Sequence, residues 1–173
     1  MKKILLSLFV CLTFLCMKCE EETPKDPIDL LPPATQTGEN TFGCLIDGEP
    51  FTPDRSPNSF SGSYIFYDGG YDLIVGGTRR KSDGILGLSI GTKNLPVMSD
   101  STYFMTNRIN GNAYGTIYRS SNISYTSNEY SGELFISKHD PENRIVSGTF
   151  WYDIKDVFGD VHQIREGRFD IKY

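Results

Sequence analysis

The chain has 173 residues, a formal net charge of -5 and 13% aromatic residues. Nucleic-acid binding depends on clustered Lys and Arg that neutralise phosphates, so this acidic composition predicts no nucleic-acid partner. Cys11, Cys16 and Cys19 all lie close to the N-terminus, so Cys44 stands alone in the rest of the chain. This distribution excludes an internal disulfide framework, and a folded domain would have to gain its stability from its core.

Residues 1–22 have the pattern of a lipoprotein signal peptide with its acylation region. Lys2 and Lys3 form a positive start, the apolar run from Ile4 to Leu15 follows, and Cys16 and Cys19 close it. The run is shorter than the roughly 20 apolar residues that a spanning helix needs. We therefore predict an exported chain that is cleaved and lipidated at a cysteine, with a plain N-terminal membrane anchor as the alternative.

Two cysteines compete as the site of lipid attachment. Neither follows a small residue, because Leu15 precedes Cys16 and Lys18 precedes Cys19. A charged Lys18 would sit badly in a membrane-embedded cleavage segment, so we favour Cys16 and keep Cys19 as the alternative. Cleavage before Cys16 removes Lys2 and Lys3, so the net charge of -5 becomes -7. Such a chain needs a lipid anchor, with palmitate among its acyl chains, rather than surface charge to stay on a membrane.

Residues 23–39 contain four prolines among polar and acidic residues, which predicts a flexible stalk. The remaining residues 40–173 are enough for one core and one domain. Short runs rich in Tyr, Phe, Thr, Ile and Val fill this region, and turn signals such as Asp47-Gly48, Asp68-Gly69-Gly70 and Asp140-Pro141 separate them. The predicted strands, in chain order, are residues 41–46, 49–52, 60–67, 71–78, 85–90, 102–106, 113–118, 122–125, 133–138, 144–154 and 161–171.

No segment of the domain shows a sustained apolar period of 3.6 residues, so we expect an all-β fold. The predicted architecture is a single antiparallel β-sandwich or flattened β-barrel of about 8–10 strands. The sequence does not decide between the sandwich and the barrel.

Two motifs at the ends of the domain resemble those of uncharacterised, β-rich lipoproteins of the Bacteroidota type, including flavobacterial ones. The first runs from Thr41 to Gly48 and continues with Pro50-Phe51-Thr52-Pro53. The second comprises Val146-Ser147-Gly148-Thr149-Phe150 and Glu166-Gly167-Arg168-Phe169-Asp170. The acidic residues Glu20 to Glu22 also resemble the surface-export signals of such lipoproteins. The resemblance implies a β-rich fold and a lipid-anchored place at the outer membrane, facing outward, but no catalytic residue.

One strand carries the candidate binding residues. In residues 144–154, Val146, Gly148, Phe150, Tyr152 and Ile154 share the face that we expect to be the core. The opposite face carries Ser147, Thr149, Trp151 and Asp153, and an aromatic ring among hydroxyls and a carboxylate suits a sugar or another small ligand. We predict a ligand surface at Trp151, Thr149 and Asp153, although Trp151 would be core if both faces were buried.

The sequence supports an enzyme active site less well than it supports a binding surface. Ser89 lies in Gly87-Leu88-Ser89-Ile90-Gly91, which fits the hydrolase motif G-x-S-x-G, but no helix-forming segment follows. His139 and His162 have no partner at metal-ligand spacing, and Cys44 sits in an apolar run, so we expect no metal site, no cofactor and an inert thiol. A binding or interaction module for a glycan, small molecule or envelope protein is the favoured function. The alternatives are a hydrolase with a spatially assembled Ser/His/Asp site and a structural subunit of an envelope complex.

Overall fold

The computed structural model describes residues 26–82 and 84–173. The predicted signal peptide, Cys16 and Cys19 therefore lie outside the described residues. Within those residues, no helix has both the length and the apolar character that a membrane span requires.

Strands make up nearly all of the regular structure. One short 3₁₀ helix, η1, spans Pro27–Leu30 and precedes them. The strands are β1 Thr41–Ile46, β2 Glu49–Phe51, β3 Phe60–Tyr67, β4 Gly70–Lys81, β5 Gly84–Lys93, β6 Ser101–Met105, β7 Asn112–Arg119, β8 Asn122–Tyr125, β9 Gly132–Asp140, β10 Ile145–Lys155 and β11 Val161–Lys172.

Asp-Gly pairs form two of the hairpins with two-residue loops. Asp47 and Gly48 connect β1 to β2 with φ values of 53° and 87°, and Asp68 and Gly69 connect β3 to β4 with 50° and 85°. Positive φ at both central residues is what a type I′ hairpin turn requires, and its twist matches that of the flanking strands. Asp and Gly adopt this conformation at little cost, which is why the chain reverses at these positions.

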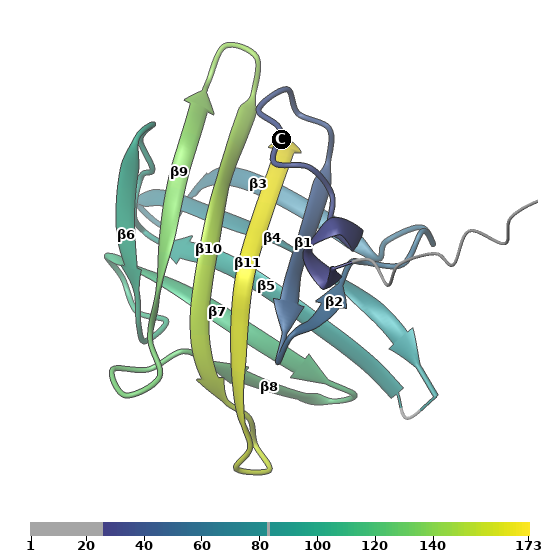
Figure 1. Cartoon of the computed structure of the whole chain (residues 1–173). Coiled ribbons are helices and arrows are strands. Elements are labelled where there is room, and N and C mark those ends of the chain that lie inside the picture. Colours follow the sequence, from purple (N-terminus) through teal and green to yellow (C-terminus); the bar gives the residue numbers. More distant parts are fainter. Residues whose placement is uncertain (1–25, 83) are drawn as a thin grey trace, which may run out of the picture.

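All eleven strands belong to one sheet that folds over on itself. Its order is β2-β1-β11-β10-β9-β6-β7-β5-β4-β3, with β8 paired to β7, and every pairing is antiparallel except β6 with β7. In Figure 1, β9, β10, β11 and β1 run steeply across the front, while β3, β4, β5, β7 and β8 cross behind them. The sheet ends at β2 and β3 and does not close. The predicted all-β fold is thus confirmed.

The core lies between these two layers, filled by the inward side chains of each strand. Tyr152 of β10 is fully buried, and its hydroxyl donates a 2.8 Å hydrogen bond to the carbonyl of Thr116 on β7. On the other side of the core, Gly62 of β3 lies directly against Ile171 of β11, leaving no room for a side chain at position 62. These contacts hold the front and back strands together and leave the outer faces free to carry a site.

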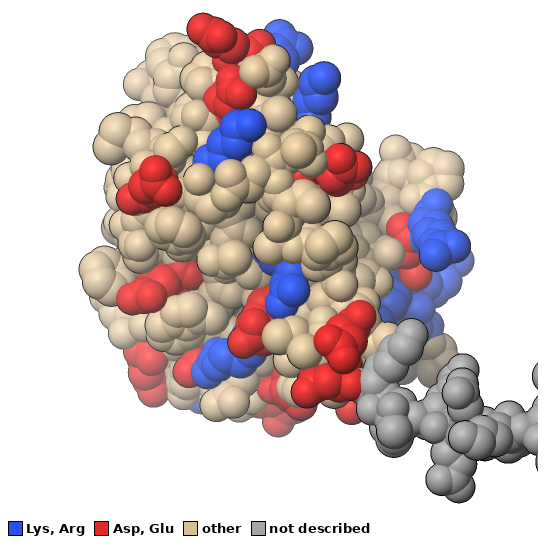
Figure 2. Space-filling view, turned by 45° about the horizontal axis from the view of Figure 1, so that its top comes forward, with Lys and Arg blue, Asp and Glu red and all other residues tan. Residues whose placement is uncertain are grey.

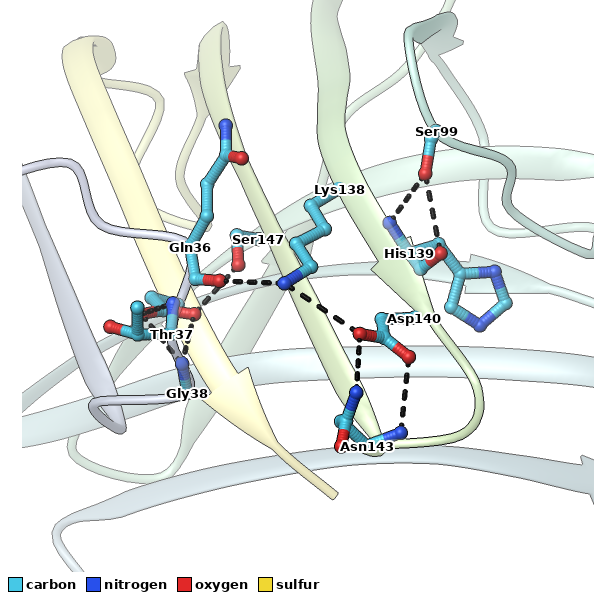
Figure 3. Close-up of polar contacts among 10 residues, drawn as sticks. Gln36, Thr37, Gly38, Ser99, Lys138, His139, Asp140, Asn143 and Ser147 are labelled. Carbon is cyan, nitrogen blue, oxygen red and sulfur yellow. Dashed lines mark hydrogen bonds and ion pairs between the residues drawn. The ribbon is translucent and has the colours of Figure 1, made fainter.

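Part of the predicted stalk is packed on the domain instead of being free. Leu31 is only 7% exposed, and Pro32 lies against Gly43 of β1. The buried carboxylate of Asp170 on β11 accepts hydrogen bonds from the hydroxyls of Thr35 and Ser147 and from the backbone N–H groups of Thr37, Gly38 and Glu39. Figure 3 shows this network around Thr37 and Gly38, where Lys138 also donates to the carbonyl of Gln36.

The prediction of a flexible stalk over residues 23–39 is therefore wrong for its C-terminal part, residues 31–39. The physical reason is the buried carboxylate of Asp170. A buried charge is costly unless it is fully hydrogen-bonded, and the backbone of residues 37–39 provides the donors.

Candidate ligand-binding groove

Trp151 lies on the outer face of the front layer. Its neighbours in β10, Phe150 and Tyr152, are buried in the core, whereas Trp151 is 40% exposed. Thr149 is also exposed and Asp153 is half-buried on the same face. The sequence left open whether Trp151 lies on a ligand surface or in the core, and its exposure contradicts a place in the core.

A groove of about 550 Å³ runs beside this tryptophan. Across the pairing of β9 with β10, Trp151 lies opposite Glu133 and Thr149 opposite Phe135. The groove brings these four together with the following further residues: Ala34 and Thr102, and Arg165, Glu166, Gly167 and Arg168 of β11. Ala34 belongs to the packed N-terminal segment, so that segment forms part of one wall.

Charged groups on both sides hold the indole ring in place. The Trp151 Nε1–H donates a 3.2 Å hydrogen bond to Oε2 of Glu133. The guanidinium of Arg165 lies 5.4 Å from the ring centre, a cation–π distance. Arg165 in turn donates to Oδ1 of Asp153 at 2.6 Å and to the carbonyl of Tyr152 at 3.2 Å. Asp153 therefore positions Arg165 and does not line the groove, unlike Trp151 and Thr149.

A β-bulge in β11 creates the opposite side of the groove. The pairing of β10 with β11 shifts between Phe150 and Tyr152, so Trp151 faces the segment from Arg165 to Gly167. Glu166 takes a left-handed conformation with φ of 53°, and Arg168 donates to its carbonyl at 3.1 Å. Bulges re-aim side chains away from the regular alternation, and here Arg165, Glu166 and Arg168 all line one groove.

The groove offers two aromatic side chains, hydroxyls, carboxylates and guanidinium groups within one hollow. This lining can stack against an apolar ring face while exchanging hydrogen bonds with hydroxyls around it. Figure 2 shows that acidic and basic residues are interspersed over the visible face, without a large patch of one sign. The groove therefore suits a polar ligand with hydrogen-bonding groups of both kinds.

Ser89 and the two histidines lie in separate surroundings. The hydroxyl of Ser89, on the outer face of β5, shares a 2.7 Å hydrogen bond with that of Thr116. His139 hydrogen-bonds to the carbonyl of Val97 and the hydroxyl of Tyr173, and His162 to Asp47, Asp156 and Arg119. Among the described residues, neither histidine is a hydrogen-bond partner of Ser89, so the geometry that the hydrolase alternative requires is not formed there.

His162 belongs to a charged cluster at the opposite end of β11 from Asp170. Its Nδ1 lies 2.7 Å from Oδ2 of Asp47 and its Nε2 lies 3.3 Å from the Arg119 guanidinium. Burial alone would raise the pKa of Asp156, but hydrogen bonds from Phe158, Asp160 and His162 hold it below its ordinary value. No set of three or more His, Cys, Asp or Glu side chains within residues 26–82 and 84–173 is placed to hold a metal ion.

Cys44 lies fully buried in the core as a free thiol, as expected from its apolar neighbours. Burial strongly raises the pKa of this thiol. Because the thiolate is the reactive form, a buried cysteine of this kind is chemically inert.

Sequence reasoning identified Trp151 and Thr149 but missed Glu133, Phe135, Arg165 and Arg168. Glu133 and Phe135 could have been found by extending the alternation of Leu134 and Ile136 to the opposite face of β9 and pairing β9 with β10 as a hairpin. Arg165 and Arg168 could not, because the bulge breaks the alternation of β11 at that point.

Comparisons with known proteins give no relative for this chain. No protein-family model matches it, and neither the curated proteins nor the solved structures contain a match. The groove must therefore be interpreted from its own chemistry.

Proposed function

We propose that this chain is a lipid-anchored protein of the cell envelope whose β-domain binds a glycan in the Trp151 groove. The observation that carries the proposal is the placement of Trp151. A large aromatic ring is left 40% exposed on the outer face of a sheet and is held by Glu133 and Arg165. Exposed aromatic rings fixed beside polar groups are suited to ligand contact, because they lose little conformational entropy on binding.

The groove residues divide between stacking and hydrogen bonding. The exposed surfaces of Trp151 and Phe135 would cover the C–H face of a sugar ring. Thr149 and Thr102 offer hydroxyls, and Glu133 and Arg168 offer a carboxylate acceptor and a guanidinium donor. A glycan carries donors and acceptors around an apolar ring face, and this arrangement matches it more closely than it matches a purely apolar ligand.

The test is a glycan screen followed by titration of the hits, with Trp151→Ala compared with the unchanged chain. Loss of the indole removes the stacking surface, so we expect glycan affinity to fall at least about tenfold, as at the centre of other binding sites. Trp151 is partly exposed, so circular dichroism and the unfolding midpoint should change little. Phe104→Ala is the matched control, because Phe104 is 75% exposed, pairs with Glu133 across β6 and β9, and does not line the groove.

The same pair of variants separates glycan binding from docking of an envelope protein. Phe104, Phe135 and Trp151 are exposed on neighbouring strands β6, β9 and β10, which favours a protein partner as the second candidate. A protein interface would extend over this apolar row, so Phe104→Ala would weaken binding as much as Trp151→Ala. Equal glycan binding by the unchanged chain and Trp151→Ala would contradict the proposed site.

We further propose that the anchor is attached at Cys16 and that the domain lies at the outer membrane. The support is the sequence pattern of residues 1–22, with Cys16 directly after the apolar run. Mass spectrometry of the mature N-terminus, with metabolic palmitate labelling, should find the acylated residue at Cys16. Cys16→Ala should abolish the label and Cys19→Ala should keep it, whereas the reverse result would assign the lipid to Cys19.

A further inference from the structure

A second cavity, of about 370 Å³, lies near the β9–β10 turn and is lined mainly by aromatic rings. Its walls are Tyr64 of β3, Tyr71 of β4, His139 of β9 and Tyr173 after β11, with Pro96 and Pro141 at its edges. Its volume falls within the roughly 300–1,000 Å³ range of small-molecule sites. It shares no lining residue with the Trp151 groove.

Tyr64 forms the floor of this cavity, and the other rings surround it. Tyr64 is 9% exposed and stacks on Tyr71 at 5.0 Å with an interplanar angle of 14°. His139 and Tyr173 stand nearly perpendicular to Tyr64, at 4.8 Å and 5.4 Å between ring centroids. Tyr71 also contacts Phe66 at 5.2 Å in an edge-to-face arrangement and remains 41% exposed, so part of its ring stays open to a ligand.

The polar atoms around the cavity are mostly engaged with one another. Nδ1 of His139 lies 2.8 Å from the carbonyl of Val97, which can only accept, so this nitrogen carries the hydrogen. In the neutral ring, Nε2 then accepts from the Tyr173 hydroxyl at 3.2 Å. The Tyr64 hydroxyl accepts from the N–H of Val97 at 3.3 Å. Both nitrogens of the imidazole are thus engaged, and the hydroxyls of Tyr64, Tyr71 and Tyr173 are the side-chain groups of the lining that can still bond to a ligand.

No Lys, Arg, Asp or Glu of the described residues lines this cavity. Burial is the main cause that raises the pKa of Tyr173. The charges of Arg144 and Asp140 act on this pKa in opposite directions, since Arg144 lowers it and Asp140 raises it. The Asp140 carboxylate accepts hydrogen bonds from Asn143 and forms an ion pair with Lys138 at the β9–β10 turn (Figure 3). The cavity thus has no charged Lys, Arg, Asp or Glu in its described lining and is lined mainly by aromatic rings, whose faces carry partial negative charge.

From these observations we propose that the cavity binds a quaternary ammonium group, such as that of choline. A quaternary ammonium has no N–H to satisfy, carries a diffuse positive charge and is attracted to tyrosine faces by cation–π interaction. A sugar would find only three phenol hydroxyls to pair with its many hydroxyls, and an anion would be repelled by the ring faces. The acidic net charge of the chain adds a weak attraction in the same direction.

The test is an NMR titration of the full-length chain with choline, following the ring signals of Tyr71 and Tyr173. The neutral analogue 3,3-dimethyl-1-butanol has the same shape without the charge and serves as the ligand control. We expect choline to shift these signals and to bind at least about tenfold more tightly than the neutral analogue. Equal binding of the two compounds, or no shift with choline, would overturn the proposal.

Variants at Tyr71 check that the ring face is responsible. Tyr71→Phe keeps the aromatic face and should retain binding, whereas Tyr71→Leu keeps apolar volume but should weaken choline binding about tenfold. Tyr67→Ala is the matched control, because Tyr67 lies in the same hairpin, is 63% exposed and does not line the cavity. Unchanged binding by Tyr71→Leu would contradict the site even if choline bound elsewhere.

The ammonium group could belong to a free solute or to a lipid headgroup, and vesicles separate these sources. Phosphatidylcholine and phosphatidylethanolamine vesicles differ in N-methylation, while a lipid anchor inserts into both. Selective shifts of Tyr71 and Tyr173 with phosphatidylcholine would identify the headgroup. Choline binding without a difference between the vesicles would identify a free solute. The choline experiments do not involve Trp151. Their result therefore tests the choline proposal separately from the proposed glycan binding.

Discussion

Glu166 has a backbone conformation that is unusual for a residue inside a strand. The other non-glycine residues with positive φ in the described part of the chain are mostly Asn and Asp, whereas Glu166 lies within β11 with φ of 53°. An L-residue with a long side chain pays about 1 kcal/mol or more for this conformation. The strain is maintained by the bulge that turns Arg165 and Arg168 toward the groove, so it is associated with the candidate site.

Replacing Glu166 by glycine should therefore stabilise the domain or leave its stability unchanged. Glycine adopts positive φ without steric cost, and the exposed ion pair of Glu166 with Arg168, at 3.5 Å, contributes little. Glu166→Val should lower the free energy of unfolding by about 1–2 kcal/mol, because a β-branched residue is worst in this region. Urea unfolding measures both changes.

Gln163→Gly provides the comparison, since Gln163 is exposed in the same strand and has no positive φ. Glycine there should cost about 0.5–1 kcal/mol. If Glu166→Gly were as destabilising as Gln163→Gly, the conformation at position 166 would not be strained.

At the level of secondary structure elements, the strands could be predicted closely because their limits are local. Asp47-Gly48 and Asp68-Gly69 each fix a hairpin, and the observed β1 and β3 have the predicted bounds 41–46 and 60–67. The alternation along β10 likewise predicts Phe150 and Tyr152 on the core face and Trp151 on the opposite face, which is the arrangement observed. Turn chemistry and side-chain alternation act over a few residues, so a single sequence contains them.

Contacts between distant elements could not be predicted in this way. Residues 35–39 are polar and follow two prolines, which indicates a linker, yet Asp170 binds them from the far end of the chain. Tyr64, His139 and Tyr173 meet in one cavity because the two layers fold over each other, and no local pattern relates them. The two layers also depend on the order of strands in the sheet, which turn signals leave undetermined.

For the whole molecule, Asp170 connects the N-terminal segment to the core. Its carboxylate binds residues 35–39, and the next residue, Ile171, packs against Gly62 of the back layer. The segment entering from the N-terminal side is therefore fastened to β11, a strand that also packs across the core against β3. Within the lipoprotein proposal, this attachment would leave fewer residues of the predicted stalk as a free linker, and it keeps Ala34 at the wall of the groove.

Three carboxylates make the stability of the molecule depend on pH in the acid range. Burial tends to raise the pKa of Asp47, Asp156 and Asp170, but hydrogen bonds outweigh it and hold each pKa below its ordinary value of about 3.9. A group whose pKa is lower in the folded state stabilises that state above its unfolded pKa. This contribution is lost as the pH falls through the folded value. We therefore expect the urea midpoint to drop as the pH is lowered below about 4.

Asp170→Asn isolates the part of this effect that belongs to the N-terminal segment. At neutral pH the variant should be less stable, because an amide replaces a carboxylate that accepts hydrogen bonds from five residues, including Ser147 and Gly38. The difference from the unchanged chain should shrink as the pH falls and Asp170 becomes protonated in both folded and unfolded states. Asp68→Asn, at the exposed β3–β4 turn, is the control for the loss of a carboxylate outside this network. A gap between Asp170→Asn and the unchanged chain that stayed constant from about pH 7 to pH 2 would show that the charge of Asp170 does not hold the segment.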